Sequence, residues 1–128
     1  MDEADAPERI RKLLLTGDNR LKQGVAPEKV RETYEEALAV AREAGLEEHF
    51  MGYGPSQVRF VGHGVGLELD ELPVLSPNDL VLEDGMVFAL EPKFVFPDLG
   101  AIGIENTWLV GAEGAERLTR ASEDIVVV

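Results

Sequence analysis

The sequence has no cysteine, few aromatic residues and a shortage of positive charge. The absence of cysteine excludes disulfide bonds, thiolate zinc sites and cysteine-based catalysis. Twenty-five acidic residues against 12 basic ones give a formal charge of −13. Because so acidic a surface repels nucleic-acid phosphates and anionic lipid headgroups, we expect neither nucleic acid nor a membrane as a partner.

Long hydrophobic runs are also missing. No apolar stretch approaches the length of a membrane span, and the acidic N-terminus, MDEADAPERI, lacks the basic-then-apolar pattern of a signal peptide. Together with the lack of cysteine, these features predict a cytoplasmic location. The hydrophobic fraction of 45% over 128 residues is sufficient for one domain with a real core.

The order of the expected elements predicts an α+β fold, with two helices packed on a curved, mostly antiparallel sheet. Residues 1–6 are expected to lie outside the folded part, with Met1 not a natural start, and the domain is expected to span 7–128. Apolar residues at helical spacing predict helices over Pro7–Gln23 and Pro27–Ala44.

The remaining two thirds of the chain favour strands, because short β-branched and aromatic runs alternate with Gly, Pro, Asn and Asp turns. A sheet of this kind exposes an edge, so we expect a homodimer formed through that edge. The predicted strands are Gln57–Val61, Met86–Phe96 with a break at Pro92, Ala101–Val110, Glu116–Thr119 and Asp124–Val128.

Three ionisable residues stand out, because Glu91 and Glu105 each lie deep in an apolar run and His63 lies among glycines. Each has an ordinary structural explanation: a salt bridge from Glu91 to Lys93 or exposure at an edge, an exposed Glu105, and a structural histidine. His49, beside two glutamates, is expected to be exposed. Taken together, one imidazole and two carboxylates match the donors preferred by Mn, Co, Fe or Zn, with positions left open for water.

Three motifs carry a resemblance to a known family: GHGVGLE at 62–68, LEP at 90–92 and GIENT at 103–107. They resemble the pita-bread metallopeptidases, which include Xaa-Pro aminopeptidase, prolidase and methionine aminopeptidase, with creatinase as a non-peptidase relative. The first motif and the helix pair before it look most like the prolidase and Xaa-Pro aminopeptidase branch. The resemblance runs from about Pro7 to the end and implies the C-terminal part of a catalytic domain.

The resemblance implies roles for the three residues. His63, Glu91 and Glu105 match three of the family's five metal ligands, and Glu105 would bridge two ions. Glu91 would also act as general base towards the attacking water. The implied activity is a metal-dependent exopeptidase, of the Xaa-Pro aminopeptidase type, that hydrolyses N-terminal peptide bonds of a peptide substrate.

Two departures from the family pattern bear on function. The other two ligands of the family are aspartates on strands before the helix pair, and we assign none of the N-terminal aspartates to them. The chain by itself is therefore expected to hold a divalent metal weakly or not at all, and to be inactive alone. In addition, Arg59 and Asp70 occupy positions where prolidase-like members often carry substrate-binding histidines. We interpret both as substrate-binding residues of altered chemistry.

Two other functions remain open at the level of sequence. A non-catalytic module that keeps the fold for binding or assembly is slightly favoured by Arg59 and Asp70. Amidinohydrolase chemistry like that of creatinase needs no metal, and the retention of all three ligand positions argues against it.

Overall fold

A computed structural model describes residues 30–112 and 114–124. The expected helix over Pro7–Gln23, residues 1–6 and nearly all of the expected strand Asp124–Val128 lie outside these ranges. Within them the chain forms helix α2, Val30–Glu43, two 3-10 turns and seven short strands. The mixture of helix and antiparallel sheet confirms the predicted α+β class.

Helix α2 confirms the second predicted helix, apart from its first residues, which lie outside the described part. Its buried face includes Val30, Tyr34 and Ala41. On its exposed face, Arg31 and Glu35 form an ion pair one turn apart, with 3.8 Å between guanidinium and carboxylate. No helix in the described ranges is long and apolar enough to cross a membrane.

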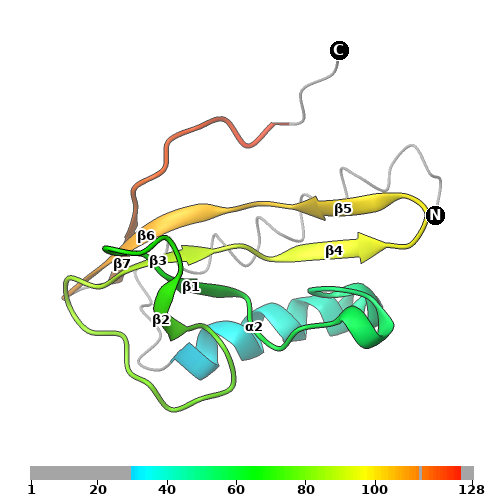
Figure 1. The fold of residues 1–128 in the computed structure, drawn as a ribbon, viewed down its shortest axis with the longest axis horizontal. Helices are drawn as coiled ribbons and strands as arrows, with labels where there is room; N and C mark the ends of the chain where they lie inside the picture. The colour runs from blue at the N-terminus through cyan, green and yellow to red at the C-terminus, as the bar shows by residue number, and fades with distance from the viewer. Residues whose placement is uncertain (1–29, 113, 125–128) are drawn as a thin grey trace.

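Five strands form one sheet in the order β2-β1-β3-β6-β7, with every neighbouring pair antiparallel. Two more strands, β4 and β5, pair as a separate hairpin that projects from the centre of this sheet (Figure 1). The bounds are β1 Gly62–Gly64, β2 Glu71–Val74, β3 Val87–Leu90, β4 Lys93–Phe96, β5 Gly100–Gly103, β6 Asn106–Gly111 and β7 Gly114–Arg117.

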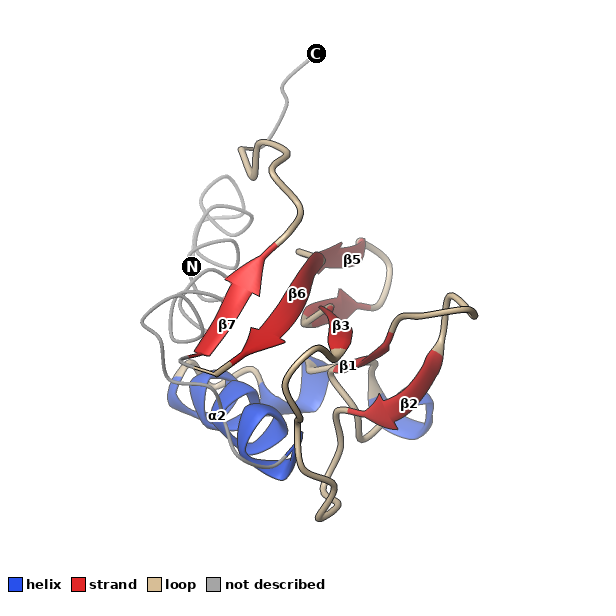
Figure 2. Ribbon diagram, turned by 90° about the vertical axis from the view of Figure 1, so that its left-hand side faces the viewer, coloured by secondary structure: helices blue, strands red, loops and turns tan. Residues whose placement is uncertain are grey.

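The core lies between α2 and one face of this sheet (Figure 2). Phe88 of β3 pairs with Trp108 of β6, and both side chains are fully buried. They pack in one cluster with Tyr34 of the helix. Because side chains alternate along a strand, the residues between them project to the opposite face, away from the helix.

Strand β1 does not lie where the sequence predicted it. The expected strand Gln57–Val61 is wrong, because ladder pairing begins only at Gly62. A Cβ atom at Gly62 would overlap the Ala89 carbonyl, and one at Gly64 would overlap the Leu72 carbonyl. The glycines are therefore the strand itself, squeezed between two partners, and apolar propensity alone could not reveal this.

His49 corrects a second expectation. Its side chain is only 18% exposed, and the ring stacks between Tyr53 and Phe96 at centroid distances of 4.9 and 4.7 Å. Ring atom Nδ1 donates to the Val95 carbonyl at 3.0 Å. The histidine therefore fastens the loop after α2 to the β4–β5 hairpin.

Replacement of His49 by alanine should lower the free energy of unfolding by about 1–3 kcal/mol, because it removes two ring contacts and a hydrogen bond. Urea denaturation followed by tryptophan fluorescence measures this change. The matched control is Glu48→Gln, which keeps both ring contacts and the Val95 hydrogen bond of His49 and changes only the exposed Glu48 carboxylate, 3.5 Å from Nε2 of His49, so it should shift stability by less than about 0.5 kcal/mol. Equal stability of the two variants would contradict the assigned contact.

Candidate metal centre

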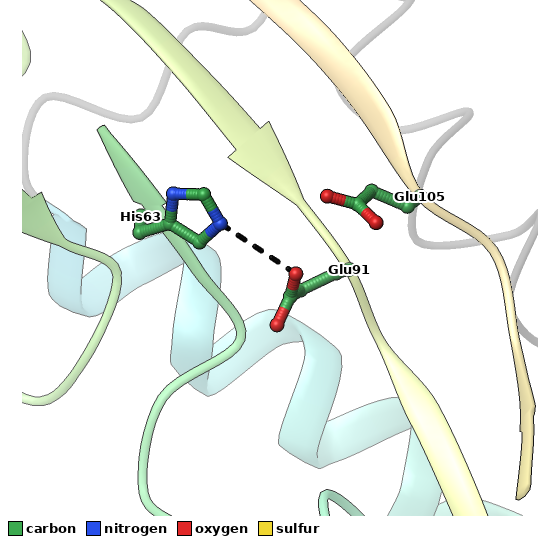
Figure 3. A group of neighbouring side chains, drawn as sticks. All are labelled: His63, Glu91 and Glu105. Atoms are coloured by element: carbon green, nitrogen blue, oxygen red, sulfur yellow. Dashed lines mark ion pairs between the residues drawn. The ribbon is translucent and has the colours of Figure 1, made fainter. Parts of the chain in front are cut away.

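The strand register brings the three predicted residues to one face of the sheet. His63 pairs with Ala89, and Ala89 pairs with Thr107 on the next strand. Glu91 lies two residues beyond Ala89, and Glu105 lies two residues before Thr107, so both share the face of His63. This face is the one opposite α2, and Figure 3 shows the three side chains projecting into a common space.

Distances and burial define a compact site. One ligand atom each from His63, Glu91 and Glu105 lies within 4.8 Å of the others. The Nε2 atom of His63 is 3.6 Å from Oε2 of Glu91, and these side chains are 12% and 22% exposed. Glu105 is exposed at the open side. The structure therefore supports a shared site over three unrelated structural roles.

The backbone fixes which nitrogen of His63 faces the carboxylates. Its Nδ1 atom lies 2.9 Å from the Gly64 carbonyl oxygen, which can only accept, so Nδ1 carries the hydrogen. In the neutral ring, Nε2 then presents its lone pair to Glu91. A nitrogen lone pair beside two carboxylates is a donor set that suits a divalent ion.

Both carboxylates lie where strands are interrupted. Glu91 follows the end of β3, and Glu105 precedes the start of β6, at the junction with the hairpin. The break opens a pocket of about 210 Å³. Its lining residues are Glu91, Pro92, Lys93, Gly103, Ile104 and Glu105. The pocket therefore leaves room for a ligand beside Glu105.

The two predicted substrate-binding residues differ in position. Oδ1 of Asp70 lies 3.7 Å from Nδ1 of His63, so the loop after β1 brings this carboxylate to the edge of the site. Arg59 is exposed, and its side chain makes no hydrogen bond or ion pair within the described ranges. Their roles towards substrate stay predictions.

A polar network that the sequence analysis missed supports the strand carrying Glu105. Asn106 is 5% exposed and accepts a hydrogen bond from the Thr119 hydroxyl at 2.7 Å. Its amide donates to Glu123 at 3.3 Å, and Glu123 also pairs with Arg117. The network fastens the segment after β7 beside Glu105. The sequence signal for this network was Asn106, a polar residue at the same alternate spacing as the apolar residues on the buried face of β6.

Comparison with known proteins identifies relatives of this chain in sequence and in fold. The chain is 40% identical over 106 residues to Xaa-Pro dipeptidase from Pyrococcus furiosus. The aligned region covers 82% of this chain and 30% of that protein. The fold of the chain superposes with a TM-score of 0.83 on an X-Pro aminopeptidase from Thermotoga maritima, at 30% identity, covering 100% of this chain and 34% of the other. An Xaa-Pro dipeptidase from Bacillus anthracis superposes with a TM-score of 0.81 at 29% identity, covering 97% of this chain and 34% of the other.

The antiparallel sheet carries helix α2 on one face and the three donor side chains on the other. This arrangement defines part of a pita-bread metallopeptidase. Residues 2–112 match the family described as metallopeptidase family M24. The chain belongs to that family. It spans about a third of the length of the relatives that it matches. The family implies a divalent metal in the complete enzyme.

Proposed function

We propose that the protein carrying this chain is a metal-dependent exopeptidase acting on Xaa-Pro peptides, and that this chain supplies the C-terminal part of its catalytic domain. The observation that carries the proposal is the convergence of His63, Glu91 and Glu105 within 4.8 Å on one face of the sheet. The printed names of relatives, Xaa-Pro dipeptidase and X-Pro aminopeptidase, support the substrate class. Manganese or cobalt fits the nitrogen and oxygen donors, and a cytoplasmic location remains a prediction.

The family resemblance and the positions of the three side chains support a role for each residue. A divalent cation bound here supplies Lewis acidity and lowers the pKa of water. The Nε2 atom of His63 and the carboxylates of Glu91 and Glu105 would hold the ion. Glu91 is also placed to take a proton from the attacking water and return it to the leaving amine. The Gly64 carbonyl keeps the imidazole in the tautomer that this arrangement needs.

Three donors are few for a pair of cations. The family resemblance implies two further aspartate ligands on strands before the helix pair, and the described residues hold no substitute beside the three. We therefore expect the 128-residue chain to bind Mn²⁺ weakly, through a single site. Open edges at β2 and β7 of the described sheet support the proposed homodimer, which sedimentation would detect.

The proposal predicts metal-dependent cleavage by the complete gene product. The complete coding sequence and the 128-residue chain alone should be assayed on Ala-Pro, with Mn²⁺, with Co²⁺ and with chelator. Release of proline is expected only from the complete form with metal. Absence of cleavage of any Xaa-Pro peptide by the metal-loaded complete protein would overturn the proposed activity. Equal cleavage by the short chain would overturn the incomplete-site interpretation.

A further inference from the structure

Lys93 is a basic side chain on the wall of the pocket that holds Glu91 and Glu105. It opens β4 and pairs across the hairpin with Gly103. A Cβ atom at Gly103 would lie 2.8 Å from the Cβ of Lys93, so the glycine leaves the space that the lysine side chain occupies. Within the described ranges the Lys93 ammonium makes no ion pair, and the expected bridge to Glu91 is not formed.

Lys93 is a half-buried residue whose ammonium has no ion pair within the described ranges, although two carboxylates line the same pocket, and this needs an explanation. When Glu91 and Glu105 bind a divalent cation, the cation neutralises their negative charge. The positive charge of Lys93 then remains without a counterion. A ligand that fills the pocket takes water away from this charge, which is unfavourable unless the ligand brings an anion to it. A ligand that fills this pocket is therefore favoured if it carries a negative group towards Lys93.

The position of Lys93 along the strand indicates which negative group of a ligand it would contact. Lys93 follows Glu91 by two residues, about 6.6 Å along an extended chain. In a dipeptide bound with its scissile carbonyl beside Glu91, the free carboxylate lies one residue further, at most about 3.8 Å on. The lysine side chain is long enough to meet it. In a longer peptide the same position holds a neutral amide.

We propose that Lys93 is a specificity-determining residue that binds the free C-terminal carboxylate of a dipeptide and so makes the site select dipeptides over longer peptides. This inference rests on the proposed peptidase function. It concerns where the substrate ends, not how the bond is cleaved. The ammonium–carboxylate pair forms beside the chemistry and leaves the proton transfers at Glu91 unchanged.

The test compares Ala-Pro with its C-terminal amide, using the complete, Mn²⁺-loaded protein and its Lys93→Met and Lys93→Arg variants. With Lys93→Met, kcat/KM for the acid should fall about 10- to 100-fold, the range of a charge-assisted hydrogen bond, while the amide is cleaved as by the parent. Lys93→Arg keeps the charge and should retain most of the preference for the acid. The control is Arg42→Met, which removes an exposed positive charge on α2 and should leave the acid-to-amide ratio unchanged.

Competition by the product gives a readout independent of turnover. Proline should bind the Mn²⁺-loaded parent more tightly than prolinamide, and Lys93→Met should abolish that difference. If Lys93→Met lowers the rates for acid and amide equally, or raises metal affinity without changing their ratio, Lys93 does not bind substrate and the inference is wrong. If the parent cleaves neither compound, the proposed function fails, and proline against prolinamide still tests the carboxylate site.

Discussion

Replacement of Gly62 by alanine is expected to destabilise the protein by about 3 kcal/mol or more, a large fraction of the free energy of unfolding of a small domain. The added Cβ would overlap the Ala89 carbonyl and approach Cδ1 of Leu75 to 2.7 Å. The backbone carbonyl belongs to the central strand β3, and it cannot move without breaking the ladder on both sides. Loss of β1 pairing would also remove His63 from the site.

Gly111→Ala is the matched control, because Gly111 is also a strand glycine and its added Cβ would make only an ordinary contact at 3.4 Å. Urea midpoints of both variants should be read by tryptophan fluorescence, since Trp108 lies in the core behind the site. Gly62→Ala should unfold at a much lower urea concentration than the parent, and Gly111→Ala should unfold close to the parent. Similar midpoints for the two would show that β1 adjusts to a side chain.

Glu91→Gln in the complete, metal-loaded protein should lower kcat on Ala-Pro by about 10²- to 10⁴-fold, the usual contribution of a general base. The amide keeps the shape of the carboxyl group but cannot accept the proton of the attacking water. Because the side chain lies at the edge of the open pocket, the urea midpoint should change by less than that of Gly62→Ala.

Glu68→Gln makes the same change of charge on the exposed loop that follows His63, outside the three-residue site. Its kcat should equal that of the parent. Bound manganese should be counted in both variants by elemental analysis, to separate loss of the ion from loss of the base. Full activity in Glu91→Gln would exclude Glu91 as the proton acceptor.

The site was more predictable from sequence than the strands that build it. A glutamate inside each of two apolar runs and a histidine between glycines are local signals, and alternation along a strand is sufficient to put Glu91 and Glu105 on one face once β3 pairs with β6. Pro92 likewise marked the real break between β3 and β4. Those features depend on backbone periodicity, which a sequence displays directly.

What the sequence did not reveal depends on contacts between distant residues. Strand β2 was missed because Glu71 and Pro73 conceal its alternation. The stacking of His49 on Phe96 joins segments far apart in the chain. The hydrogen bond from Thr119 to Asn106 does the same. Nothing local distinguishes such a histidine from one facing water, and the position of Asn106 among the buried residues of β6 does not by itself name Thr119 as its partner.

The hydrogen bond from His63 to its neighbour's carbonyl has a consequence for the durability of the site. Many metal-binding histidines depend on a second side chain for their orientation, and one substitution at that partner can release the ring. Here the acceptor is the main chain of Gly64, which every amino acid would provide. Ring orientation is thus inherited from the sheet, and a mutation can disturb it only by disturbing the strand.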